Sequence, residues 1–229
     1  MTSLRAAILA CCAFGGAIVF AVNEGEPRAA SGILATASRP PQRGYVRRAA
    51  PAHRSYLGEL LLHHDSVVMR WPDRITQPVT VWIRAEAPVP DWNPDVVTEV
   101  REALVEWEAT GIPVRFMFID DSASADVRIT WVDRFAERVS GRTFWTRNDA
   151  HYVTEGIVEL ARHHAWGAPL DMASIHALAL HEIGHVLGLD HTTDADAIMA
   201  PRVRSRSLTA ADISTVRALY ALPAGPLAR

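Results

Sequence analysis

Residues 181–191 read HEIGHVLGLDH and place three histidines and two carboxylates within eleven positions of an otherwise apolar stretch. The surrounding pattern predicts a helix over residues 171–187. On this helix His181 and His185 are four residues apart, so their imidazoles point the same way, about 40° apart around the axis. The two rings are therefore placed to bind a single ion.

The third histidine lies beyond the predicted end of this helix. Gly188 is free to adopt a positive φ, which would end the helix and turn His191 back toward the first two rings. Three neutral imidazoles leave the fourth position of a tetrahedral Zn²⁺ open to water, as in catalytic zinc sites rather than structural ones. We therefore predict one catalytic Zn²⁺ held by His181, His185 and His191.

Glu182 is the candidate general base. It follows the first ligand in sequence and is rotated about 100° from it around the helix, which makes it an inconvenient fourth ligand. It can still reach a water at the open position. Two alternatives fit less well, because histidines at the edge of a core would not need this ordered spacing, and a purely structural zinc would leave Glu182 without a role.

The wider pattern resembles a known family. HEIGHVLGLDH followed by AIMAP resembles the metzincin zinc peptidases, in which H-E-x-x-H-x-x-G-x-x-H precedes a methionine turn, here with Met199. The GLDH segment, the spacing to the methionine and the closing stretch LTAADISTVRALY are most similar to the matrixins. The resemblance covers about residues 67–222 and is strongest over residues 177–201.

The resemblance implies an α/β (α+β) zincin fold. Its parts would be a twisted mixed sheet with an antiparallel edge strand, an active-site helix, a Met-turn and a C-terminal helix. It also implies an exported zinc endopeptidase in which Glu182 activates a zinc-bound water and then passes the proton to the leaving amine. Met199 would lie beneath the ligands as an apolar floor.

The chain departs from the family pattern at several points. The family's latency switch needs a cysteine in the pro-segment, and the only cysteines are Cys11 and Cys12. Loops for a second zinc and for calcium are not recognisable between residues 131 and 156, so we expect no second structural metal. Weaker candidates for a second ion are Asp149, His151, His163 and His164.

Several residues are predicted to contact the substrate. Residues 156–162, GIVELAR, are predicted to form the edge strand above the cleft, where an extended substrate would pair near Val158. Ala177 lies one turn before the first ligand, and its small side chain leaves space beside the metal. By the resemblance, Pro201 and Val203 line the opposite wall, and the pocket after the scissile bond would accept Leu, Met or Phe.

The remaining elements follow from local patterns. Strand-like runs occur at residues 67–71, 79–84, 113–120, 125–133 and 142–145. One amphipathic helix is predicted over residues 93–111, with Asn93 as cap and Gly111 as stop. Another is predicted over residues 208–222, with Thr209 as cap.

Composition divides the chain into three regions. Residues 1–22, with an uncharged apolar run from residue 6, are typical of a signal peptide or an N-terminal membrane anchor. Residues 23–65 are rich in Arg, Pro and Ala, which favours a flexible tether or a pro-segment. Residues 66–229 would form the catalytic domain, without a disulfide because no cysteine follows Cys12.

Length and charge limit the partners. A chain of 229 residues with a net charge of −3 has room for one ordinary domain and no overall attraction to nucleic acid. We expect a monomer that acts on protein or peptide substrates, with any membrane attachment through residues 6–22. Two other functions stay open: a catalytically weak, surface-anchored metal-containing binding module, and a zinc hydrolase of non-peptide amides. The intact Glu182 argues against the binding module.

Overall fold

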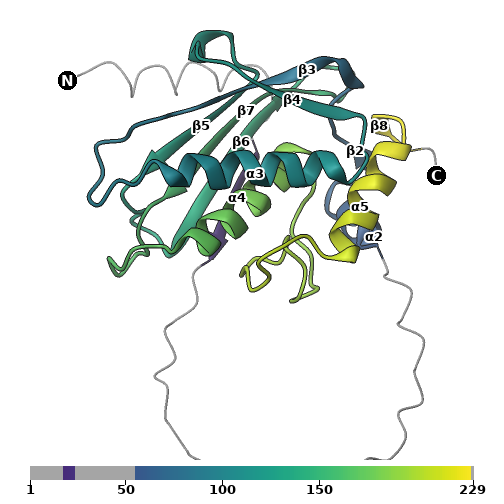
Figure 1. Cartoon of the computed structure of the whole chain (residues 1–229). Helices are drawn as coiled ribbons and strands as arrows, with labels where there is room; N and C mark the ends of the chain where they lie inside the picture. The colour runs from purple at the N-terminus through teal and green to yellow at the C-terminus, as the bar shows by residue number, and fades with distance from the viewer. Residues whose placement is uncertain (1–17, 24–54, 228–229) are drawn as a thin grey trace, which may run out of the picture.

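The computed structural model describes residues 18–23 and 55–227, which are coloured in Figure 1. Most of the predicted signal peptide or anchor, and residues 24–54 of the predicted tether, lie outside these described residues. Among the helices that are described, none has the length and apolar character needed to cross a membrane.

One mixed sheet forms the centre of the fold. Its strands, in spatial order, are β1 (Ile18–Asn23), β6 (Val139–Arg147), β7 (Val153–Ala161), β5 (Val127–Val132), β3 (Arg74–Ile83) and β4 (Val114–Phe118). Neighbours among β7, β5, β3 and β4 are parallel, whereas β6 runs antiparallel to β7 and β1 antiparallel to β6. This arrangement of mostly parallel strands with an antiparallel side confirms the predicted fold class.

The prediction that residues 156–162 form the edge strand is wrong. These residues belong mainly to β7, which lies between β5 and β6. Val158 is fully buried and pairs with Ile129 on one side and with Thr143 on the other. Composition identified a strand here correctly, but the place of a strand within a sheet depends on pairing with distant segments. On its antiparallel side β7 is followed by β6, and β1 lies beyond β6 at the edge of the sheet.

Two helices cover one face of the sheet. Helices α3 (Asp95–Ala109) and α4 (Met172–Val186) lie side by side there (Figure 1). The N-cap residue of α3 is Pro94, one position after the predicted cap, and the Asn93 side chain accepts a hydrogen bond from the Asp95 N–H at 2.9 Å. The indole of Trp107 on α3 donates to the Leu180 carbonyl of α4 at 2.9 Å, which joins the two helices in the core.

The chain after α4 forms a smaller part below the sheet. It includes α5 (Ala210–Ala221), which Thr209 caps as predicted: the Thr209 hydroxyl accepts from the N–H of Asp212, whose carboxylate accepts from the Thr209 N–H.

The predicted strand at residues 67–71 is shorter than expected. Only β2 (Val67–Val68) forms, and it pairs with β8 (Gly225–Pro226) outside the main sheet. A short 3₁₀ helix, η2 (Ser122–Ser124), precedes β5.

Helix α2 (Leu57–His63) packs against this smaller part, beside α5 (Figure 1). Leu60 and Tyr56 are buried, and the Tyr56 hydroxyl donates to Asp212 of α5 at 2.9 Å. The folded unit therefore begins before residue 66, where composition had suggested the start of the domain. The mixed composition of this segment gave no sign that Tyr56 attaches it to α5.

Candidate metal centre

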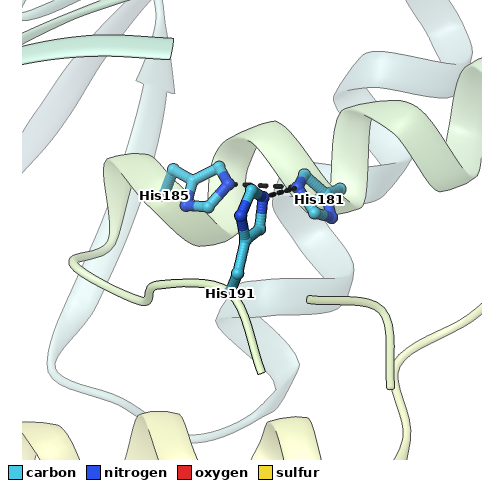
Figure 2. A group of neighbouring side chains, drawn as sticks. All are labelled: His181, His185 and His191. Carbon is cyan, nitrogen blue, oxygen red and sulfur yellow. Dashed lines mark hydrogen bonds between the residues drawn. The ribbon is translucent and has the colours of Figure 1, made fainter. Parts of the chain in front are cut away.

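Three imidazoles converge next to the second half of α4. His181 and His185 project from the helix, and His191 comes from the loop that follows it (Figure 2). The Nε2 atom of His181 lies 3.0 Å from Nε2 of His185 and 3.2 Å from Nε2 of His191. Each residue thus offers one ligand atom to a common point, and all of these atoms lie within 4.8 Å of one another.

The far side of two rings is held by the backbone. Nδ1 of His181 lies 2.7 Å from the carbonyl oxygen of Ile198, and Nδ1 of His185 lies 2.9 Å from that of Leu189. A carbonyl only accepts, so in both rings the proton resides on Nδ1 and the lone pair on Nε2. This is the tautomer that a metal ligand needs, and the donor set therefore fits a zinc ion.

Burial keeps the three rings neutral. It lowers the pKa of His181 to about 3, with a further decrease from the charge of His191. The pKa of His185 is also well below its usual value, first through burial and then through the neighbouring histidines. Burial is likewise the main reason why the pKa of His191 is lowered. Neutral imidazoles at neutral pH are available to bind a metal without first losing a proton.

Glu182 is fully buried beside these ligands. Its Oε2 accepts a hydrogen bond from the Thr143 hydroxyl of β6 at 2.6 Å, while its Oε1 has no hydrogen-bond partner among the described residues. Burial raises the pKa of Glu182 to about 8, although the bond from Thr143 acts in the opposite direction. A buried carboxylate oxygen without a partner is costly in a purely structural role and suits a group that receives a proton.

Strand β6 passes very close to this carboxylate. A Cβ atom placed on Gly141 would lie 2.2 Å from Oε1 of Glu182, so a larger residue there must displace the side chain. Neither Gly141 nor Thr143 was recognised from sequence as part of the site. A glycine inside a strand often marks the close approach of another group, and this signal was present at Gly141.

Glycines also bring the loop and the methionine up to the helix. Met199 is fully buried, and a Cβ on Gly184 would lie 2.4 Å from its sulfur, so Met199 contacts α4 between the two ligand positions. Gly188 has a φ of +98°, and a Cβ there would lie 2.2 Å from the Met69 carbonyl oxygen. The sharp turn after α4 therefore requires glycine for its conformation and for its close packing.

Comparison with known proteins agrees with this arrangement. A family model described as Matrixin matches residues 73–221, a segment that contains the three histidines, Glu182 and Met199. The chain belongs to the matrixin family. The match also includes the strands and helices from β3 to α5, so the resemblance seen in the motif extends through the fold.

Two similar proteins are metalloendoproteinases by name, and a third is a metalloelastase by name. Metalloendoproteinase 1-MMP of Arabidopsis thaliana is 31% identical over 141 residues, which cover 55% of this chain and 38% of the relative. Metalloendoproteinase 4-MMP of the same plant is 28% identical over 166 residues, 66% of this chain and 48% of the relative. Macrophage metalloelastase of Oryctolagus cuniculus is 36% identical over 63 residues, 25% of this chain and 14% of the relative. The matrixin thus aligns with less than half the length of each.

The residues predicted to contact substrate lie in different places. Ala177 is buried on α4, Val203 is partly buried against the core, and Pro201 is exposed in the loop after Met199. Val158 lies inside the sheet of the matrixin and offers no open edge. Of the strand residues, the structure brings Gly141 and Thr143 of β6 to the site instead.

A second group of side chains of the types that can ligate a metal lies between α3 and α4. It consists of Glu99, Glu102 and His176. Nδ1 of His176 is 3.3 Å from Glu99, and its Nε2 is 3.1 Å from Glu106. Because both ring nitrogens already contact a carboxylate of α3, these contacts are explained by the packing of the two helices. Asp149, His151, His163 and His164 form no such group within the part of the chain that is described.

Proposed function

We propose that this matrixin is a zinc-dependent endopeptidase that hydrolyses peptide bonds in protein or peptide substrates. The observation that carries the proposal is the convergence of three Nε2 atoms beside a buried carboxylate oxygen without a partner. Export from the cytoplasm is part of the proposal and rests on the apolar run at residues 6–22.

The residues present are suited to this chemistry. Zinc held by His181, His185 and His191 would supply Lewis acidity, polarising the scissile carbonyl and lowering the pKa of water. Glu182 would take a proton from the attacking water and release it to the leaving amine. Burial favours the protonated carboxyl, whereas a cation on the adjacent histidines favours the carboxylate, so Glu182 is balanced between the two states that the reaction needs.

An extended substrate would lie along β6 rather than β7. β6 carries Gly141 and Thr143, which contact Glu182, and its outer side already pairs with another strand, β1. Residues 18–23 of the chain pair antiparallel with this side, with Phe20 opposite Thr143. The backbone of β6 is therefore able to accept an added strand next to the catalytic carboxylate.

A casein assay tests the proposal. The purified full chain should hydrolyse casein, lose activity in excess chelator and regain it with added Zn²⁺. Glu182→Ala should keep the zinc but lose at least about 100-fold in turnover, because it removes the base and not a ligand. Glu86→Gln, which alters an exposed carboxylate in the segment after β3, is the matched control.

The assay also separates the two other functions. A binding module would bind zinc and leave casein intact, and a hydrolase of non-peptide amides would cleave a small amide but not casein. Casein hydrolysis that persists in chelator and in Glu182→Ala would overturn the proposed mechanism.

A further inference from the structure

The third ligand depends on its loop more than the other two do. His181 and His185 lie on α4 and are fully buried, whereas His191 lies on residues 189–194, here called the ligand loop, and is only partly buried. The His191 N–H donates to the Asp190 side chain within the loop, and the Thr192 N–H donates to the Met199 carbonyl outside it. The position of the His191 ring is therefore set by whatever holds this loop.

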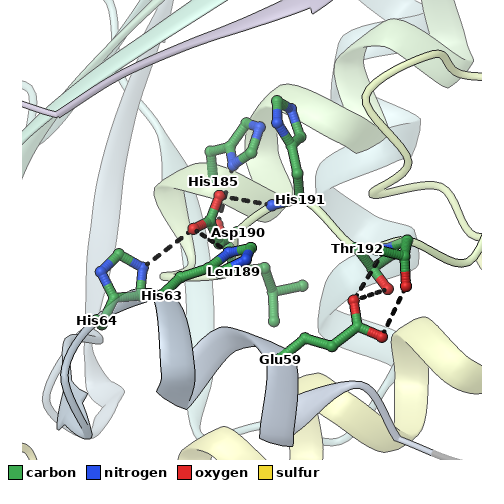
Figure 3. A network of polar contacts seen from close by, with 9 residues as sticks. Glu59, His63, His64, His185, Leu189, Asp190, His191 and Thr192 are labelled. Carbon is green, nitrogen blue, oxygen red and sulfur yellow. Dashed lines mark hydrogen bonds and ion pairs between the residues drawn. The ribbon is translucent and has the colours of Figure 1, made fainter.

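Helix α2 contacts the loop directly after His191. The Glu59 carboxylate accepts three hydrogen bonds there: from the Thr193 N–H at 2.8 Å, from the Thr193 hydroxyl at 3.0 Å and from the Thr192 hydroxyl at 3.0 Å (Figure 3). Both carboxylate oxygens take part. One side chain thus holds the two residues that immediately follow the third ligand.

The same helix contacts the residue directly before His191. Nδ1 of His63 lies 3.2 Å from Oδ2 of Asp190, and Nε2 of His64 lies 3.5 Å from the same oxygen (Figure 3). The other oxygen of Asp190 accepts from the His191 N–H at 2.6 Å. Helix α2 therefore contacts the ligand loop on both sides of the third ligand.

Helix α2 is in turn attached to the body of the domain. Its buried Leu60 packs in the core, and the Tyr56 hydroxyl donates to one oxygen of Asp212. The other oxygen of Asp212 accepts from the Ile198 N–H at 3.0 Å, and the Ile198 carbonyl is the partner of Nδ1 of His181. Helix α2 is thus connected to the surroundings of the first ligand as well as the third.

We propose that α2 holds the third zinc ligand in place, and that Glu59 is the main positioning residue, acting on His191 through Thr192 and Thr193. The proposal rests on the zinc site of the proposed function. Glu59 is the strongest candidate because it makes three hydrogen bonds, one of them to a backbone N–H, whereas His63 and His64 each make one contact. These bonds lower the pKa of Glu59, so it accepts them as a carboxylate at neutral pH.

Zinc release tests the proposal without relying on peptide hydrolysis. The full chain is loaded with zinc and mixed with excess chelator, and the rate of zinc transfer is followed. Glu59→Ala should release zinc about tenfold faster than the unaltered chain, in the range found when groups that orient metal ligands are removed. Glu59→Gln retains an acceptor oxygen but loses the charge, so its release rate should fall between the two.

Two controls separate positioning from general loss of structure. Leu62→Ala changes an 80% exposed side chain on the same helix and should release zinc at the normal rate. Hydrogen exchange of the zinc-free chain should be faster at residues 192–193 in Glu59→Ala, with exchange in α4 unchanged. This second measurement is available even if zinc loading of the variant is poor.

The outcomes are distinct from those of the casein assay. Faster zinc release and faster exchange in Glu59→Ala support the positioning role, whether or not the unaltered chain cleaves casein. Unchanged release and unchanged exchange at residues 192–193 overturn it, even if the chain proves to be an active peptidase. Equal acceleration in Leu62→Ala would also overturn it, because the effect would then belong to the helix as a whole.

Discussion

The two carboxylate oxygens of Glu182 have different hydrogen-bond partners, and this difference depends on Thr143. The Thr143 hydroxyl donates to Oε2, whereas Oε1 has no partner among the described residues. A single donor of this kind fixes the plane of the carboxylate and directs the other oxygen to the place where a water would react. Because Thr143 is fully buried on β6, no solvent molecule replaces its hydroxyl easily.

Replacing Thr143 should therefore affect turnover more than substrate binding. A hydrogen bond to a charged group contributes about 1.5–3 kcal/mol, so Thr143→Val should lower kcat by about tenfold or more, with KM and zinc content near normal. Thr143→Ser keeps the hydroxyl and should restore most of the rate. Steady-state kinetics on a peptide substrate, with zinc measured on the same samples, gives the comparison. If the Val and Ser variants lose the same activity, the hydroxyl has no positioning role.

Strand β6 and helix α4 approach each other through a glycine, and this contact brings the strand to the site. With no side chain at Gly141, the Glu182 carboxylate occupies the space beside the strand. The same close approach places the Thr143 hydroxyl within reach of the Glu182 carbonyl as well, at 3.1 Å. The separation of one strand and one helix thus determines the surroundings of the Glu182 carboxylate.

Gly141→Ala should displace that carboxylate. The added Cβ would lie 2.2 Å from Oε1 of Glu182, and the side chain can move away only by giving up its orientation. We expect a loss of kcat of at least about tenfold with zinc still bound, because the histidines are not displaced. Gly58→Ala, where a Cβ would meet no atom within 4 Å, is the matched control and should retain full activity. Normal turnover in Gly141→Ala would show that the carboxylate reacts from another position.

The whole domain is organised around α4. His181 and His185 on this helix lie between β6 on one side and the Met199 turn on the other. Glu59 of α2 contacts the loop that carries His191, and Asp212 of α5 contacts Ile198 next to Met199. Without disulfides after Cys12, noncovalent contacts and a bound metal have to connect these parts. Zinc should therefore contribute to the stability of the entire unit and not only to that of the site.

Removal of the metal should lower the melting temperature. A ligand present at 100 times its Kd stabilises the native state by about 2.7 kcal/mol, so chelation of the zinc-loaded chain should shift Tm downward by several degrees. His185→Ala should bind less zinc, and its Tm should respond little to chelator. Calorimetry of both chains with and without chelator provides the test. An equal shift in the two chains would mean that the stabilising metal is bound elsewhere.

The convergence of the three histidines could be predicted from residues 181–199 because it depends on local geometry. The spacing of four residues places His181 and His185 on one side of any helix, and Gly188 permits the turn that returns His191. The matching methionine follows within the same short stretch. These features require no knowledge of the rest of the chain.

The surroundings of the site depended on contacts between distant segments. Thr143 lies 39 positions from Glu182, and Glu59 lies 133 positions from Thr192. The order of strands likewise placed β6, and not β7, at the side of the site, because sheet order results from pairing between segments far apart in sequence. A strand pattern specifies that a strand forms and which residues alternate, but the neighbours of that strand are chosen only when the whole chain packs.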